Sequence, residues 1–156
     1  MHDLRQIIEE ARPSVLQLFG FDQAVENHLD RSVRDSGSTI EWTIDDAAEG
    51  AIDALDRNVA TALFRIVQEA INNAIRHAHA QRIVVELRAT SRQLSVAVRD
   101  DGVGLTVPPK HSGGGIGNMR TRARLISARC EISANPDGKG TLVQVTLPMN
   151  PPRTAL

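Results

Sequence analysis

Residues 63–78 read LFRIVQEAINNAIRHA, and the pattern within this stretch decides the fold. On a helix of about 3.6 residues per turn, most of its apolar side chains gather on one face, namely Val67, Ala70, Ile71, Ala74, Ile75 and Ala78. The opposite face aligns the polar side chains of Glu69, Asn73, Arg76 and His77. The stretch therefore predicts an amphipathic helix, within Asp56–Ala80, that buries one side and presents a carboxylate, an amide, a guanidinium and an imidazole on the other.

Shorter strand and helix patterns lie on both sides of this helix. Strand patterns occupy Thr39–Asp45, Arg82–Thr90, Gln93–Arg99, Cys130–Ala134 and Thr141–Leu147. Further helix patterns occupy Asp3–Leu18, Phe21–Val33 and Ile116–Arg129. In the first of these, Pro13 predicts a break near Arg12. Residues 45–53, acidic and rich in alanine, are expected to form a loop. This order predicts an α+β fold, a two-layer α/β sandwich in which a mixed sheet carries its helices on one face.

The composition excludes several classes of function. The net charge of -1 provides no overall field for nucleic acid, and an aromatic content of 3% provides little stacking surface, so we expect no nucleic-acid partner. Cys130 is the single cysteine, which excludes an intramolecular disulfide and a multi-cysteine zinc site. No apolar run approaches the roughly 18 residues of a membrane span and no signal sequence is visible, so we expect a soluble, cytoplasmic protein.

A second motif follows the strand pattern that ends at Arg99. Asp100-Asp101-Gly102-Val103-Gly104 places a carboxylate at the end of a strand, beside glycines that leave room for a flat ligand against the main chain. Asp-Gly is also among the commonest turn pairs, so a plain turn is an alternative interpretation of this motif. The glycine-rich and proline-containing residues from Asp101 to Gly115 are predicted to form a mobile loop.

Two further glycine motifs lie downstream. Ser112–Asn118 runs through consecutive glycines into a predicted helix, and N–H groups at a helix start form a ready phosphate site. Gly138-Lys139-Gly140-Thr141 opens the last strand. Taken singly, Ser112–Asn118 also fits a flexible linker followed by an ordinary helix cap, and Gly138–Thr141 also fits a hairpin turn. The polar face of residues 69–77 likewise fits the solvated surface of an amphipathic helix. The G-x-x-x-x-G-K-[ST] pattern is absent, and the glycines do not follow a strand as in a Rossmann unit.

The ordered set of motifs resembles the GHKL superfamily of ATPases and kinases, whose ATP-binding domain is the Bergerat fold. The set comprises Glu-xxx-Asn on a helix, Asp-x-Gly-x-Gly after a strand, Gly-x-Gly opening a helix and Gly-Thr before the last strand. Residues 63–78 further resemble the N-box of the NarX/UhpB-type sensor histidine kinases, and Gly117-Asn118-Met119-Arg120-Thr121-Arg122-Ala123 resembles the G-x-x-M-R-x-R-A signature of that subfamily. The resemblance covers roughly residues 4–148.

The resemblance implies a role for each motif residue. Asn73 would hold Mg²⁺ against the ATP phosphates, Glu69 would orient the nucleophile or accept its proton, and Asp100 would bind the adenine amino group. The other implied nucleotide-binding residues are Arg76 and His77 near phosphate or ribose, Gly102 and Gly104 beside adenine, Gly115 and Gly117 facing phosphate, and Thr141 on the adenine side. ATP and Mg²⁺ are therefore the expected cofactors, and Val103–Gly114 would be the ATP lid.

The reaction implied by the resemblance is transfer of the γ-phosphoryl group of ATP to a histidine, and from there to an aspartate on a response regulator. The family phosphorylates a histidine in the pattern H-[DE]-x-x-x-Q. After His2-Asp3 the glutamine, Gln6, comes one position too early, so we expect the acceptor on a dimerisation domain that is missing here. The full-length protein would be a homodimer and this chain a monomer.

Three segments follow from the same resemblance. Residues 1–35 would be a helical linker after the dimerisation domain, residues 36–148 the ATP-binding catalytic domain, and residues 149–156 a disordered tail. Two other functions stay open: a stand-alone serine kinase of the anti-sigma-factor type, and a non-catalytic module that binds nucleotide only as a conformational ligand. The M-R-x-R-A helix and the N-terminal segment favour the histidine kinase over the serine kinase.

Overall fold

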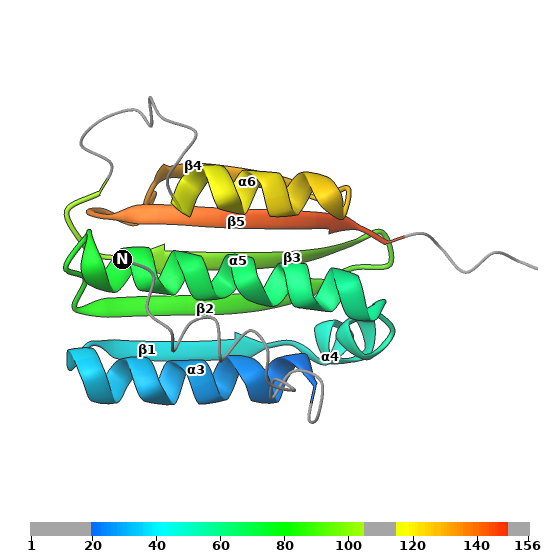
Figure 1. The fold of residues 1–156 in the computed structure, drawn as a ribbon, viewed down its shortest axis with the longest axis horizontal. Helices are drawn as coiled ribbons and strands as arrows, with labels where there is room; N and C mark the ends of the chain where they lie inside the picture. The colour runs from blue at the N-terminus through cyan, green and yellow to red at the C-terminus, as the bar shows by residue number, and fades with distance from the viewer. Residues whose placement is uncertain (1–19, 105–114, 150–156) are drawn as a thin grey trace, which may run out of the picture.

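The computed structural model describes residues 20–104 and 115–149, which form a mixed five-stranded sheet covered by helices on one face (Figure 1). The strand order is β1-β2-β3-β5-β4; β1 and β2 are parallel, and the other neighbours are antiparallel. The strands are β1 (Thr39–Ile44), β2 (Arg82–Ala89), β3 (Gln93–Asp100), β4 (Arg129–Ala134) and β5 (Thr141–Pro148). The helices are α3 (Phe21–Ser36), α4 (Asp46–Asp53), α5 (Arg57–Arg76) and α6 (Gly115–Leu125). The predicted two-layer α+β sandwich is confirmed.

The core lies between the helices and the sheet. Alternate residues of the three central strands point toward the helices and are buried, namely Ile83, Val85, Leu87, Leu94, Val96, Val98, Val143, Val145 and Leu147. Helix α5 lies across them with its predicted apolar face buried, from Val67 to Ala74, while Arg76 is exposed. The alternating apolar side chains of the strands and the apolar face of the helix thus pack into one core.

Residues 46–53 form a helix, so the loop predicted for residues 45–53 was wrong. Helix α4 begins after Asp45, whose side chain accepts a hydrogen bond of 2.7 Å from the N–H of Ala48. Ala48 and Ile52, one turn apart, are both buried. An N-cap aspartate followed by acidic residues in the first turn is favourable for a helix.

Helices α5 and α6 end earlier than their periodicity predicts. His79 has a φ of 52° and Ser127 a φ of 58°, both in the left-handed region that stops a helix. After α6, the N–H of Ala128 donates to the carbonyl of Ala123 at 2.8 Å, which closes the helix end. The predicted helix at Asp3–Leu18, most of the predicted lid and residues 150–156 lie outside the described residues.

Helix α3 packs into the same core as the rest of the fold. Phe21 and Phe64 of α5 meet edge to face with ring centroids 6.5 Å apart, and Ala24, Val25 and Leu29 are buried beside them. The sequence analysis assigned this segment to a linker over residues 1–35. Because its apolar face is shared with α5, we propose that α3 belongs to the ATP-binding domain.

His28 of α3 is buried against Phe64, with ring centroids 6.4 Å apart, and its Nε2 atom has no hydrogen-bond partner among the described residues. Burial and the charge of Arg31 lower its pKa from 6.5 to about 4; Arg65 adds to this, and the side chain of Asn72 opposes it. The unfolded chain therefore takes up this proton at higher pH than the folded chain does.

Folding stability is expected to fall as the pH drops below 6.5, because the lowered pKa of His28 favours the unfolded state there. The loss from this residue between pH 7 and pH 5 is about 2 kcal/mol. Urea unfolding of the native protein and of His28→Leu at both pH values measures it, with the exposed His77→Gln as the control. His28→Leu should lose most of the pH dependence, and an unchanged dependence would show that His28 does not cause it.

Candidate functional site

Asp100 ends β3 with its side chain buried, at 7% exposure. The Oδ1 atom of its carboxylate accepts hydrogen bonds from the N–H of Gly102 at 2.9 Å and from the N–H of Thr141 at 3.3 Å. Burial raises the pKa of this carboxyl, the two N–H bonds oppose that shift, and the charge of Asp101 adds to it. Thr141 is itself buried at the start of β5. Both bonds from the described residues go to one oxygen, Oδ1, which fixes the carboxylate.

The glycines around Asp100 allow the main chain to approach closely. A side chain at Gly102 would overlap the carbonyl oxygen of Ala78, just past the end of α5. The N–H of Val103 donates to that same carbonyl at 2.9 Å. Gly104 has a φ of 79° and lies against the carbonyl of Gly140. The Asp-x-Gly-x-Gly segment therefore packs between the residues that follow α5 and those that precede β5.

Three residues that the sequence analysis did not assign to the site support it. Gly140, with a φ of 115°, packs so closely that a side chain there would overlap the carbonyl oxygen of Asp100. Asp101 holds the start of β2, since its Oδ1 atom accepts the N–H groups of residues 81 and 82, both at 2.9 Å. Asn135 donates to the Asp100 carbonyl at 3.0 Å. The glycine was visible in the Gly138–Thr141 motif, but the two polar contacts had no sequence signal.

The remaining predicted site residues lie on α5 and α6. On α5, Glu69 and Asn73 are half-buried, and Arg76 and His77 are exposed at the end of the helix. Gly115 and Gly117 lie in the first turn of α6. In Figure 1 the end of α5, the end of β3, the start of α6 and the start of β5 all lie at the left of the sandwich. The fold thus gathers the four motifs at one end of the molecule, although no hydrogen bond or ion pair among the described residues joins the α5 side chains to Asp100.

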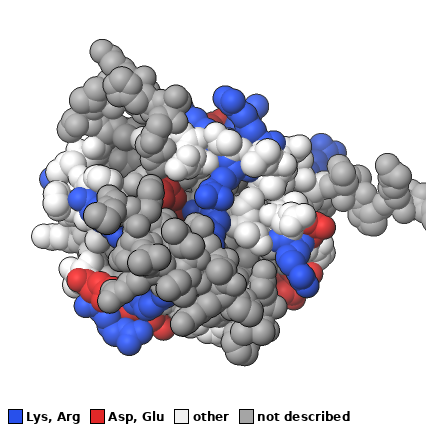
Figure 2. Space-filling model, in the orientation of Figure 1, with Lys and Arg blue, Asp and Glu red and all other residues white. Residues whose placement is uncertain are grey.

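The electrostatic character of this face is mixed. In Figure 2, which views the helix-covered side of the sandwich, basic and acidic side chains are interspersed over the described part of the surface, consistent with a net charge of -1 for the chain. The first turn of α6 has no acidic side chain, so its N–H groups and helix dipole favour an anion. Within residues 20–104 and 115–149, no group of three or more His, Cys, Asp and Glu side chains could hold a metal ion by itself.

Residues 58–151 match the family described as "Histidine kinase-, DNA gyrase B-, and HSP90-like ATPase". The chain belongs to this ATPase family. It is also 35% identical over 158 residues to an uncharacterized sensor-like histidine kinase of Chloroflexus aurantiacus, and 32% identical over 151 residues to the sensor histidine kinase LiaS of Bacillus subtilis. These alignments cover 95% and 96% of this chain but 26% and 40% of the relatives, so the chain spans less than half of each relative's length.

Solved structures share the fold of this chain, at lower sequence identity than the two relatives above. The Acinetobacter baumannii histidine kinase AdeS superposes with a TM-score of 0.65 at 15% identity, over 94% of this chain and 78% of that chain. The histidine kinase domain of the blue-light activated histidine kinase of Erythrobacter litoralis gives 0.61 at 23% identity, over 83% and 59%. None of the described helices of the ATPase-family chain is long and apolar enough to cross a membrane.

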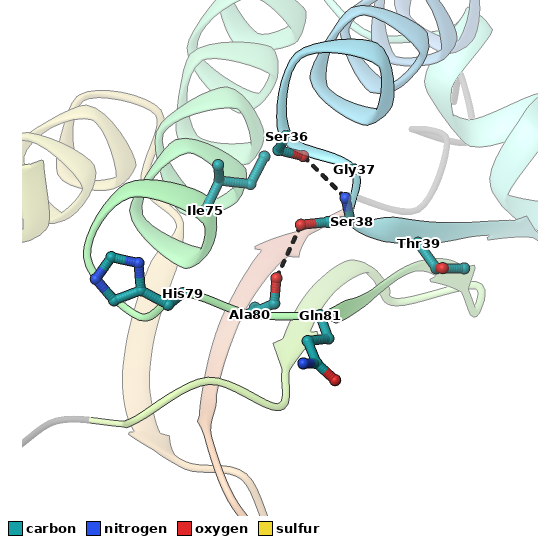
Figure 3. Close-up of a pocket in the computed structure, with 8 residues that line it drawn as sticks. All are labelled: Ser36, Gly37, Ser38, Thr39, Ile75, His79, Ala80 and Gln81. Carbon is teal, nitrogen blue, oxygen red and sulfur yellow. Dashed lines mark hydrogen bonds between the residues drawn. The ribbon is translucent and has the colours of Figure 1, made fainter.

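A cavity of about 610 Å³ lies between the end of α3 and the turn after α5 (Figure 3). Ser38 closes one wall, since its hydroxyl donates to the carbonyl of Ala80 at 2.8 Å and its N–H donates to the hydroxyl of Ser36 at 3.1 Å. None of the site residues predicted from the sequence lines this cavity.

Gly140→Ala is expected to destabilise the fold by at least about 2 kcal/mol, because the new side chain meets the Asp100 carbonyl and the backbone has a φ of 115°. Gly50→Ala, inside α4 with open space around it, is the matched control and should stabilise by up to about 1 kcal/mol. Urea unfolding measures both variants. Equal stability of the two would contradict the close packing described for Gly140.

Proposed function

We propose that this chain is the Mg-ATP-binding catalytic domain of a sensor histidine kinase, as its relatives' names suggest. The observation that carries the proposal is the buried carboxylate of Asp100, which is held through one oxygen by the N–H groups of Gly102 and Thr141. It lies at the same end of the sandwich as the polar end of α5 and the first turn of α6. A subfamily of the NarX/UhpB type stays a prediction.

In this proposal Asp100 accepts a hydrogen bond from the adenine amino group through its second carboxylate oxygen. Gly102 and Gly104 provide a surface without side chains, against which a flat ring can lie. Thr141 closes the adenine side next to Asp100. A carboxylate that is already fixed by two N–H groups binds this ligand without losing further freedom.

The phosphates would extend from the adenine pocket toward α6. Gly115 and Gly117 place N–H groups at the helix start, where the dipole favours a phosphate. Arg76 and His77, exposed at the end of α5, are the candidate phosphate or ribose contacts. Asn73 supplies the amide oxygen that suits Mg²⁺, which typically binds through one or two protein oxygens together with substrate phosphates. When bound there, Mg²⁺ would neutralise the charge that develops on the phosphates.

The proposed reaction moves the γ-phosphoryl group to a histidine imidazole of a dimerisation domain. A P–N bond forms, the bond from the γ-phosphorus to the bridging oxygen breaks, and ADP leaves. Glu69, half-buried on the polar face of α5, accepts the imidazole proton or orients the ring. The phosphoryl group then passes to an aspartate of a response regulator. We place the domain in the cytoplasm, as part of a homodimeric protein.

Phosphotransfer to a supplied dimerisation domain tests the proposal. The chain is incubated with γ-labelled ATP, Mg²⁺ and a histidine-bearing dimerisation domain of a relative, and the product is treated with acid. Acid-labile label that disappears when the acceptor histidine is replaced by alanine supports a histidine kinase. Acid-stable phosphoserine would indicate the serine-kinase alternative, and tight ATP binding without any label would indicate a non-catalytic nucleotide module.

A further inference from the structure

Asn135 follows the last residue of β4 and makes a contact that spans 35 residues of sequence. Its Nδ2 atom donates to the main-chain carbonyl of Asp100 at 3.0 Å. Its own N–H donates to the carbonyl of Gly140 at 3.0 Å, and its Oδ1 atom accepts the N–H of Asp137 at 3.0 Å. A longer contact of 3.5 Å joins Nδ2 to the carbonyl of Lys139. One side chain therefore bonds both the β4–β5 turn and the end of β3.

The Asp100 carbonyl needs such a donor because the strand ladder ends one residue earlier. The pairing of β3 with β5 extends only as far as Arg99 and Leu142. Beyond that pair, Gly140 packs against the Asp100 carbonyl oxygen in place of a strand partner. A carbonyl buried at such a point is costly without a hydrogen bond, and Asn135 supplies it.

We infer that Asn135 is a positioning residue for adenine recognition, acting through Asp100. Asn135 fixes the main chain of Asp100, while Gly102 and Thr141 fix its carboxylate. With both ends held, the free carboxylate oxygen has a single position relative to the purine. The inference rests on the proposed function, because it assumes that Asp100 binds the adenine amino group.

A purely structural role in the hairpin would have a different signature. Asn135→Ser keeps a hydroxyl that can accept the N–H two residues on, but its shorter side chain withdraws the donor from Asp100. Asp137→Ala is the matched control, since it alters an exposed side chain of the same turn without touching Asp100. Purine riboside triphosphate, which lacks the 6-amino group of ATP, separates adenine recognition from general binding.

The experiment is calorimetric titration of the native chain and both variants with ATP and with purine riboside triphosphate. In Asn135→Ser the Kd for ATP is expected to rise about tenfold, the Kd for purine riboside triphosphate to stay unchanged, and Asp137→Ala to match the native chain. Equal losses for both nucleotides, or no loss for ATP, would overturn the inference. Failure of the native chain to bind ATP at all would instead overturn the proposed function, and the inference with it.

A second measurement covers the case in which Asn135→Ser weakens the fold. The amide protons of Gly102 and Thr141 bond the Asp100 carboxylate in the free protein, so their NMR shifts report its position without nucleotide. Both shifts are expected to move in Asn135→Ser and to stay in place in Asp137→Ala. Unmoved shifts in a folded Asn135→Ser protein would refute the positioning role.

Discussion

Asp100→Asn is expected to weaken ATP binding about a hundredfold or more while the chain stays folded. The new side chain has the same shape, and its amide oxygen still accepts the N–H groups of Gly102 and Thr141. Its NH₂ group then stands where the free carboxylate oxygen was, so a donor faces the donor amino group of adenine. The lost charge-assisted bond and the unsatisfied groups each cost about 1–3 kcal/mol.

Calorimetry with ATP measures the affinity, and thermal unfolding shows that the variant is folded. Because burial raises the pKa of the Asp100 carboxyl, removing its charge should leave the Tm equal or higher at neutral pH. In the native chain, acidification should also weaken ATP binding as Asp100 becomes protonated. Because its pKa is raised, this loss should begin at a higher pH than it would for an aspartate with an ordinary pKa. Asp137→Asn, which changes an exposed carboxylate in the β4–β5 turn, is the control. Near-native ATP affinity in Asp100→Asn would refute the adenine assignment.

Asn73→Ala is expected to remove most of the Mg²⁺-dependent part of ATP affinity and to slow phosphoryl transfer about a hundredfold or more. The reason is that Asn73 offers the amide oxygen of the half-buried polar face of α5, and adenine recognition around Asp100 does not involve it. Titrations with ATP in Mg²⁺ and in EDTA separate the two parts. Asn72→Ala is the matched control, because Asn72 is on the α3 side near His28. Equal Mg²⁺ dependence in both variants would rule out Asn73 as the metal ligand.

The elements that the sequence predicted well are those with a strong period. Helix α5 and the central strands bury one face each, and residues such as Val67 and Val96 mark that face by spacing alone. The Asp100 motif was recognisable because strand and glycine turn are adjacent in the chain. Helix α4 was missed because it is short and its decisive signal is a single cap, the bond from Ala48 to Asp45.

The supporting contacts of the site could not be predicted from the sequence. Asn135 lies in an Asn-Pro-Asp-Gly turn, and its bond to Asp100 exists only because β5 brings the turn beside the end of β3. Gly140 looked like an ordinary hairpin glycine until the fold placed the Asp100 carbonyl against it. Such contacts depend on the register of distant strands, which no local pattern encodes.

The most direct test of the central claim is a titration of the native chain with ATP, with and without Mg²⁺, and with GTP for comparison. The account predicts saturable binding of ATP that strengthens with Mg²⁺ and far weaker binding of GTP, whose carbonyl at the equivalent position offers no donor to Asp100. Absence of ATP binding, or equal affinity for ATP and GTP, would contradict it.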